Sequence, residues 1–142
     1  MLARKNDIIK EHYEMLAELR YGLRQFLRFS ENAAHTVGVT PQQHQAMLAI
    51  KGFPGRDYIT IGELAERLQI LHHSAVGLAN RLVLERYARR VPSQKDRRQV
   101  YLALTARGEI VLEKLSAVHR EQLQRVGPQI IHLLKGLRGN NS

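Results

Sequence analysis

The sequence contains no cysteine, which excludes disulfide bonds, thiol redox chemistry and thiolate metal sites, and fits a reducing cytoplasm. It has no apolar run near the roughly 18 residues that a membrane span requires. Its start, MLARKNDIIKEHYEM, lacks the uninterrupted apolar stretch of a signal peptide. Internal repeats and low-complexity tracts are also absent. We therefore expect a cytoplasmic protein that does not associate with membranes.

Acidic residues are few relative to basic ones. The 142 residues, one ordinary domain in length, include 22 Lys and Arg against 13 Asp and Glu, a net charge of +9 and a pI near 10.4. Such a balance indicates a polyanionic partner such as nucleic acid. Ribosomal proteins, nucleases and histone-like proteins share it, so the position of the charge in the fold decides between functions.

Both ends of the chain predict amphipathic helices. Apolar residues recur at helical spacing over residues 7–34, which predicts one long helix. Thr105 is a suitable N-cap for a helix that we expect to end at Gly127 and Pro128. A last short helix is predicted over residues 129–137. The apolar faces of these helices require a partner, either an intramolecular core or a second copy of the chain.

The middle of the chain carries two signals for helix starts. Thr40 and Gln43 have the spacing of a capping box, and Pro41 suits the first helical position. Thr60 and Glu63 have the same capping-box spacing after a short β-favouring segment, YIT. Two further helices and a short strand are therefore predicted, with the glycine-rich KGFPGRD as a loop between them.

The segment HHSAVGLANRLVLER predicts a helix with two different faces. One face is apolar and consists of Ala75, Leu78, Ala79 and Leu82. The opposite face is small and polar, and consists of His73, Ser74, Gly77, Asn80 and Arg81. Such a helix can pack on a core with one side and enter a groove of DNA with the other.

The hydrophobic pattern then changes to a period of two, which predicts a hairpin of residues 87–91 and 99–104 around PSQKDRR. The stretch from Arg86 to Arg98, both ends included, contains six basic residues and one acid. We expect the tip residues Lys95, Arg97 and Arg98 to contact the phosphate backbone or the minor groove. Asp96 is expected to bind the backbone of the turn and to hold Arg98. A solvated, solubilising hairpin is the alternative.

Two short helices joined by a tight turn and followed by a hairpin with a basic tip predict a winged helix-turn-helix. The expected fold class is mainly α with a small β-wing. Within a single chain of residues 1–142, residues 41–105 would form the DNA-binding lobe. Residues 1–36 and 106–142 would form a flanking helical lobe for dimerisation.

The segments IGELAERLQILHHSAVGLANRL and ARRVPSQKDRRQVYLALTARGE resemble the MarR family of bacterial transcriptional regulators. The most specific element is the wing motif, which comprises Asp96, Arg97, Arg98, Leu102, Leu104, Thr105 and Gly108. The resemblance covers nearly the whole chain. It implies a homodimer with interlocking terminal helices and with recognition helices in successive major grooves of a pseudo-palindromic operator. It also implies that a small aromatic or anionic effector can release the DNA.

Four positions depart from the family pattern. Gln69 and Leu71 stand where many members have a glycine and a polar cap, and Arg86 replaces a common glycine. Gly77 stands where an arginine is frequent, so base recognition is expected to depend on other residues of the helix. The predicted DNA-binding residues are His72, His73, Ser74, Gly77, Asn80, Arg81, Lys95, Asp96, Arg97 and Arg98.

A ligand site is predicted on the first helix, where Arg20, Arg24 and Arg28 are four residues apart and share one face. The family's pocket location implies that Arg20 and Arg24, with Tyr21 and His44, bind the carboxylate of an aromatic acid. The function predicted is thus a ligand-responsive repressor. The alternative is a solvated stripe whose repulsion acids such as Glu18 and Glu31 relieve.

Two other functions remain as alternatives, and a third is not expected. A metal-responsive regulator of the same fold would use some of the seven histidines, but the adjacent His72 and His73 point about 100° apart on a helix and no HExxH motif is present. A nonspecific architectural protein would explain the charge but not the long amphipathic helices. An enzyme is not expected, because no nucleophile elbow or phosphate-binding glycine loop is present.

Overall fold

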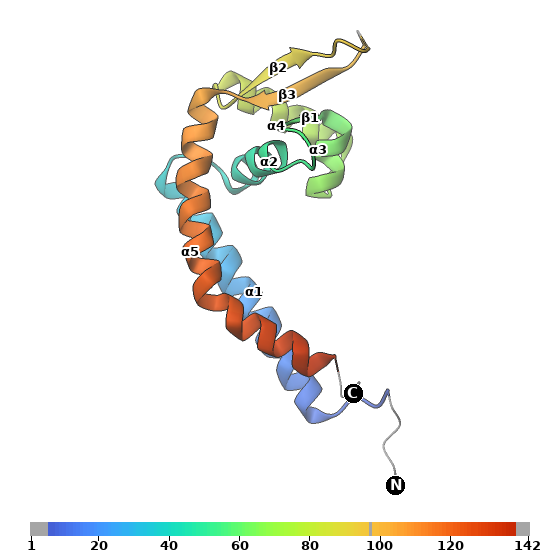
Figure 1. The fold of residues 1–142 in the computed structure, drawn as a ribbon, viewed down its shortest axis with the longest axis vertical. Helices are drawn as coiled ribbons and strands as arrows, with labels where there is room; N and C mark the ends of the chain where they lie inside the picture. The colour runs from blue at the N-terminus through green and yellow to red at the C-terminus, as the bar shows by residue number, and fades with distance from the viewer. Residues whose placement is uncertain (1–5, 97, 139–142) are drawn as a thin grey trace. The chain divides into compact units, whose positions relative to one another are not determined.

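The structure, a computed structural model, describes residues 6–96 and 98–138 (Figure 1). Its elements in chain order are α1 (Lys10–Thr36), α2 (Pro41–Lys51), β1 (Tyr58–Thr60), α3 (Ile61–Leu68), α4 (His72–Leu84), β2 (Ala88–Pro92), β3 (Val100–Leu104) and α5 (Ala106–Leu137). A helical protein with a small antiparallel sheet is thereby confirmed. None of the helices in the described ranges has the length and apolar character that crossing a membrane requires.

The chain divides into two compact units, and both long helices contribute to each. The winged-helix unit spans Glu31–Ala117 and contains α2, α3, α4 and the sheet. The helical unit consists of the chain up to Ser30 and the part of α5 from Val118 onward. The candidate DNA-contacting residues of α4 and the hairpin all belong to the winged-helix unit.

The core of the winged-helix unit forms between its helices and one face of its sheet. The strand order is β1-β3-β2, with all pairings antiparallel, and Ile59 lies opposite Leu102. The largest fully buried side chains are Met47, Ile50, Ile59, Leu64, Leu78, Leu82, Leu102 and Leu115. Burying a side chain of this size contributes about 1.5 to 3 kcal/mol, so this core holds α4 and the base of the hairpin in place.

Both capping boxes are confirmed. The Thr40 hydroxyl accepts a hydrogen bond from the Gln43 N–H (3.1 Å), and the Gln43 side chain accepts one from the Thr40 N–H (2.9 Å). Thr60 and Glu63 make the same reciprocal pair at the start of α3. Partial burial would raise the pKa of the Glu63 carboxyl, but the hydrogen bonds from Thr60 and the charge of Arg56 lower it overall.

The helical unit is a pair of antiparallel helix segments from α1 and α5 that lie side by side (Figure 1). The rings of Phe26 and Phe29 meet the His119 ring edge-on, with distances between ring centres of 5.8 and 5.4 Å. His119 also shares a 2.8 Å hydrogen bond with the Ser30 hydroxyl. Gly136 lies so close to Met15 that a Cβ there would be 2.6 Å from the Met15 sulfur. The two segments are therefore in direct contact.

The prediction that Gly127 and Pro128 end a helix was wrong. α5 continues through both residues to Leu137. A proline inside a helix removes one backbone hydrogen bond and costs about 3 kcal/mol. Beyond the proline, Leu133 is buried and Gly136 packs against Met15 of α1. Packing of the last turns against α1 offsets the cost of the proline. A rule based on local sequence does not include this packing energy.

Candidate nucleic-acid interface

The predicted two-faced character of α4 is confirmed. Its apolar face, Ala75, Leu78, Ala79 and Leu82, is buried in the core. The side chains of His72, His73, Ser74, Asn80 and Arg81 are exposed. Gly77 lies among them, and a Cβ at this position would meet no atom within 4 Å. The helix thus presents a polar strip with a shallow centre, a shape that can approach the floor of a DNA major groove.

The start of α4 has no side-chain cap. Leu71 occupies the N-cap position in an extended conformation, and its side chain, 67% exposed, offers no acceptor. The N–H groups in the first turn of a helix need acceptors from a cap, from water or from a ligand. Those of α4 can therefore bind a phosphate oxygen, with the helix dipole adding to the attraction.

The tip of the hairpin is organised by two short side chains. The Ser93 hydroxyl, which is buried, accepts hydrogen bonds from the N–H groups of Lys95 (3.3 Å) and Asp96 (3.2 Å). The Asp96 carboxylate accepts one from the N–H of Arg98 (2.9 Å). The predicted bond from Asp96 to the turn backbone is present, and it joins Arg98 through its main chain rather than its guanidinium. Arg97 lies outside the described residues.

A side-chain hydrogen bond joins the hairpin to α4. The guanidinium of Arg90, on β2, donates to the side-chain oxygen of Asn80, on α4. Both side chains are exposed, so the bond lies on the surface that also carries Arg81. It links a candidate base-contacting residue to the strand that leads to the basic tip.

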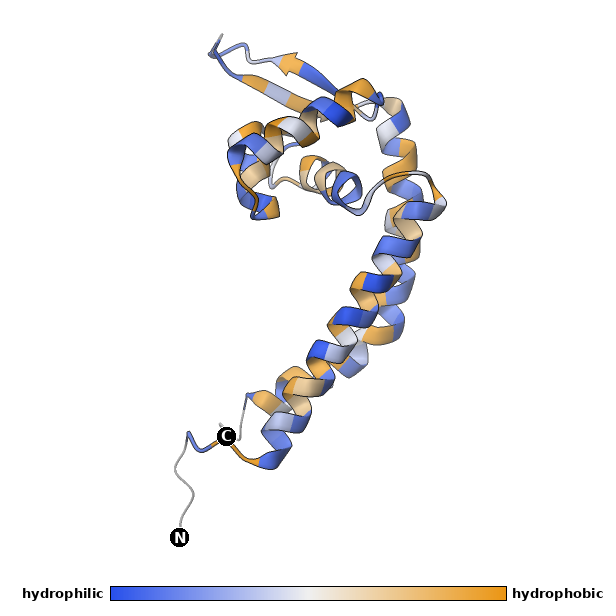
Figure 2. Cartoon of the chain, turned by 180° about the vertical axis from the view of Figure 1, so that it is seen from behind, coloured by the Kyte–Doolittle hydropathy of each residue, from blue (hydrophilic) through white to orange (hydrophobic). Residues whose placement is uncertain are grey.

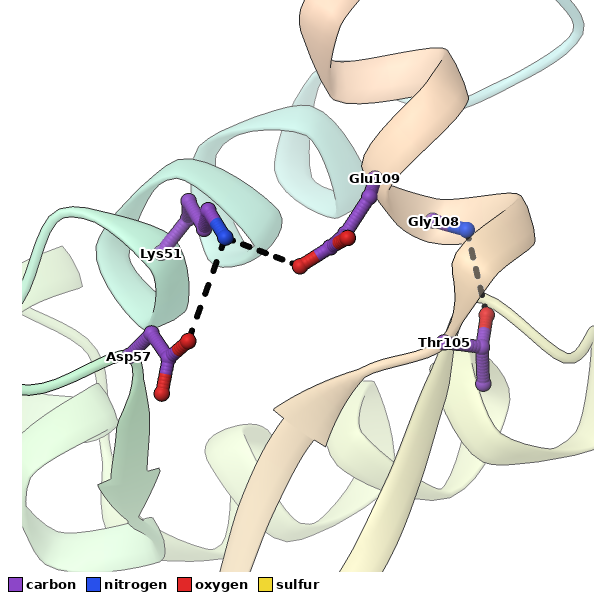
Figure 3. Close-up of polar contacts among 5 residues, drawn as sticks. All are labelled: Lys51, Asp57, Thr105, Gly108 and Glu109. Atoms are coloured by element: carbon purple, nitrogen blue, oxygen red, sulfur yellow. Dashed lines mark hydrogen bonds and ion pairs between the residues drawn. The ribbon is translucent and has the colours of Figure 1, made fainter.

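The base of the hairpin is packed too tightly for any side chain at Gly108. A Cβ on Gly108 would lie 2.0 Å from the carbonyl oxygen of Tyr87. The Gly108 N–H donates to the Thr105 hydroxyl (3.1 Å; Figure 3). The Thr105 hydroxyl in turn donates to the carbonyl of Arg86 (2.5 Å). Thr105 and Gly108 of the wing motif therefore have a structural role, which is to join the first turn of α5 to the residues that lead from α4 into β2.

An ion pair fixes the first turn of α5 to α2. The Lys51 ammonium lies 2.8 Å from the Glu109 carboxylate and 3.9 Å from that of Asp57 (Figure 3). The hydrogen bond and charge of Glu109 raise the pKa of Lys51. The three side chains are exposed, so the pair contributes little to stability.

Three residues on this surface were not predicted as part of the site. Arg90 was counted only in the total charge, because a sequence does not show that it reaches Asn80. Ser93 resembles any turn serine until its burial is known. Val76, 39% exposed on α4, was missed because apolar residues were assigned to the core; its exposure beside Gly77 places it where it can contact a thymine methyl group.

The predicted ligand residues do not form one cluster in either unit. Arg20, Tyr21 and Arg24 are exposed on the part of α1 in the helical unit, whereas His44 is buried on α2 in the winged-helix unit. Tyr21 lines a groove of about 500 Å³ between α1 and α5. Neither Arg20 nor Arg24 is among the described residues that line this groove. In residues 6–96 and 98–138, no three His, Asp or Glu side chains are placed to hold a metal ion.

Comparisons with known proteins agree with this geometry. A sequence model of the MarR family matches residues 37–99. Among curated proteins no match is found. The transcriptional regulator Tm0710 from Thermotoga maritima shares 25% identity, with a TM-score of 0.64, over 92% of this chain and 94% of that one. A MarR family protein from Bacillus stearothermophilus shares 19% identity, with a TM-score of 0.74, over 93% and 94%.

A mutant of MepR from S. aureus, whose structure contains an oligodeoxyribonucleotide, shares 19% identity, with a TM-score of 0.65, over 82% of this chain and 83% of that one. These likenesses extend beyond residues 37–99 and include the flanking helices. Residues 37–99 therefore match the MarR family in sequence, and the chain has the winged-helix fold of the solved structures to which it is similar.

Proposed function

We propose that the protein is a sequence-specific, double-stranded-DNA-binding transcriptional regulator that acts as a homodimer, and that it is a ligand-responsive repressor. The observation that carries the proposal is the surface shared by α4 and the hairpin. There the exposed polar face of α4 is joined through Asn80 and Arg90 to the strand that leads to the tip cations Lys95 and Arg98.

The division of roles on this surface follows from side-chain chemistry. On α4, His73, Asn80 and Arg81 carry donors and acceptors that can distinguish base edges in the major groove. The cations of the tip can bind phosphates whatever the sequence, and this contributes affinity that falls with salt. The net charge of +9 strengthens the second contribution. The structural relative with a bound oligodeoxyribonucleotide supports DNA as the partner.

The homodimer is supported by apolar surface on the helical unit. Large apolar side chains are exposed along both of its helices, and orange positions recur along α1 and α5 in Figure 2. The exposed residues include Tyr13, Leu16, Leu23 and Leu27 on α1, and Leu123, Ile131 and Leu134 on α5. A soluble monomer rarely exposes so much apolar surface in one region. A second copy of the same helices would cover it with two-fold symmetry.

Ligand response is proposed on Arg20 and Arg24, whose guanidinium groups are exposed on α1. Among the residues that the structure describes, neither forms an ion pair. A carboxylate ligand can therefore bind them without displacing an acid of the protein. Such a ligand weakens DNA binding only if it prefers the DNA-free conformation, and by no more than that preference.

The decisive experiment is selection of duplexes from a random pool with the purified chain. We expect an inverted repeat whose half-sites lie about 34 Å apart along the DNA. Sedimentation of the complex should show two chains per duplex. Pools without an enriched sequence would overturn the proposal in favour of a nonspecific architectural protein, and one chain per duplex would overturn the homodimer.

The ligand response is tested on the selected duplex. Benzoate-like and phenolic acids are titrated against the complex formed by wild type and by Arg24→Ala. Release of DNA from wild type but not from the variant is expected. If no acid releases DNA, or if the variant responds as wild type does, Arg24 does not bind an effector.

A further inference from the structure

The sheet of the winged-helix unit has a second face, which points away from the core. Successive side chains of a strand point to opposite faces, so Ile59 and Leu102 lie on the core side and their neighbours on the other. The strand pairing aligns Tyr58 of β1 with Ala103 of β3, and Ala103 with Arg89 of β2. A small residue thus lies between a ring and a guanidinium on this outer face.

This arrangement forms a groove. Its volume is about 410 Å³, and its lining includes Tyr58, Arg89, Lys95, Tyr101 and Ala103. Ala103 lies at the centre because it is on the middle strand, between the larger side chains of β1 and β2. Pockets of about 300 to 1,000 Å³ are typical of sites for small organic ligands. The outer face of the sheet is therefore large enough for a ligand of one or two rings.

One wall of the groove is aromatic. The ring centres of Tyr58 and Tyr101 lie 4.8 Å apart, and the two ring planes are inclined at 62°. The guanidinium of Arg56 lies 5.1 Å from the Tyr58 ring centre and 5.8 Å from that of Tyr101, while its own charge is paired with Glu63. The two tyrosines thus contact each other and the Arg56 guanidinium, and they offer an aromatic surface against which a flat ring can pack.

The charge of the lining favours an anion. Arg89 and Lys95 line the groove, and within the described residues neither forms an ion pair. The acid in the lining, Asp57, lies 3.9 Å from the ammonium of Lys51. A cationic ligand would meet these like charges, whereas a carboxylate or phosphate would gain charge-assisted hydrogen bonds from the guanidinium and the ammonium.

We propose that this groove is a binding site for a small planar anion, an aromatic ring that carries a carboxylate or a phosphate. The ring packs against Tyr58 and Tyr101 over Ala103, and the anionic group binds Arg89 and Lys95. The groove lies on the face of the sheet away from Asn80, because Arg90, the next residue along β2, points to the opposite face and binds Asn80. Lys95 belongs both to this groove and to the tip that is proposed to contact DNA. The proposal does not rest on the proposed function and is tested without DNA.

The test uses the full-length ¹⁵N-labelled chain and follows amide signals by NMR. Benzoate and adenosine monophosphate serve as probes for a carboxylate and a phosphate source. Benzyl alcohol supplies a ring without charge, and inorganic phosphate supplies charge without a ring. We expect at least one aromatic anion to shift the amides of Tyr101 and Ala103 to saturation, and the two control compounds to bind at least about tenfold more weakly.

Three variants locate the site. Arg89→Gln removes a guanidinium of the groove, Ala103→Leu fills its centre, and Arg90→Gln removes the same charge one residue away on the opposite face. The first two should weaken binding by about tenfold or more, and the third should leave it unchanged. Ala103→Leu is scored only if its thermal unfolding resembles that of wild type; otherwise Arg89→Gln against Arg90→Gln decides.

The proposal is overturned if neither aromatic anion shifts these amides at about 10 mM, a concentration that detects even very weak ligands. It is also overturned if inorganic phosphate binds as well as adenosine monophosphate and benzoate does not bind. An equal loss of affinity in Arg89→Gln and Arg90→Gln would likewise show that general charge, rather than the groove, attracts the anion.

Discussion

The Arg90 guanidinium on β2 donates a hydrogen bond to the side-chain oxygen of Asn80 on α4. The Asn80 oxygen is thereby engaged within the protein, and its NH₂ group remains to donate to an acceptor on a base edge or a phosphate. The same bond restrains the strand before the hairpin tip relative to the helix. Base contact by α4 and phosphate contact by the tip are therefore expected to be coupled.

The first prediction is that Asn80 and Arg90 act as a pair in DNA binding. In a double-mutant cycle of Asn80→Ala and Arg90→Ala, the coupling energy should be about 1 kcal/mol, the usual net value of one hydrogen bond. Fluorescence anisotropy on the selected duplex measures it. The matched control is a cycle of Asn80→Ala with Arg89→Ala, because Arg89 lies on the opposite face of β2; its coupling should be near zero. Equal coupling in the two cycles would contradict the pairing.

The second prediction concerns Asp96, whose carboxylate accepts a hydrogen bond from the Arg98 N–H. Asp96→Ala should weaken DNA binding by about 0.5 to 1.5 kcal/mol, although it removes a negative charge, because the tip loses a bond that fixes its conformation. Asp96→Asn keeps an acceptor and removes the same charge, so it should bind at least as tightly as wild type. Tighter binding by Asp96→Ala would show that only the charge matters.

Features that depend on local chemistry were predictable from the sequence. The capping boxes at Thr40 and Thr60 involve residues three positions apart, so their spacing alone located the starts of α2 and α3. The two-faced pattern of α4 likewise needed only helical periodicity. Contacts between distant residues were not predictable in this way. The Arg90 bond to Asn80 and the burial of Ser93 exist only once the hairpin has folded beside α4.

Pro128 shows the opposite case, in which a correct local rule gives a wrong result. The rule describes the cost of a proline in a helix, but the contacts of Leu133 and Gly136 in the helical unit were not visible in the sequence. Gly108 was assigned to the wing motif by family resemblance alone. The structure supplies its physical reason, which is the 2.0 Å approach of a Cβ to the Tyr87 carbonyl oxygen.

The third prediction follows from this approach. Gly108→Ala should lower the free energy of unfolding by about 2 kcal/mol or more, because the new methyl group would overlap backbone that cannot move without disrupting the base of the hairpin. Urea unfolding followed by circular dichroism measures the change. Gly127→Ala is the control, since a Cβ at Gly127 meets nothing within 4 Å and alanine should stabilise the helix by about 0.5 to 1 kcal/mol. Two variants of equal stability would contradict the steric argument.

The last prediction concerns the two residues other than glycine that have positive φ, Gln69 (φ 55°) and Arg86 (φ 66°), among those the structure describes. Each stands at a position where many family members are expected to have a glycine. The backbone therefore keeps the left-handed conformation although the side chain disfavours it. The Arg86 carbonyl accepts a hydrogen bond from the Thr105 hydroxyl, and the Arg86 N–H donates one to the Val83 carbonyl. These surrounding bonds impose the conformation.

A residue with a side chain pays about 1 to 2 kcal/mol to adopt the left-handed conformation. Glycine avoids this cost, but its greater freedom in the unfolded chain cancels part of the advantage. Arg86→Gly should therefore be more stable than Arg86→Ala by about 1 kcal/mol. The two variants remove the same charge and the same long side chain, so their difference in urea midpoint isolates the backbone effect. If Arg86→Ala proves as stable as Arg86→Gly, the turn after α4 relaxes to a negative φ in solution, and the position carries no strain.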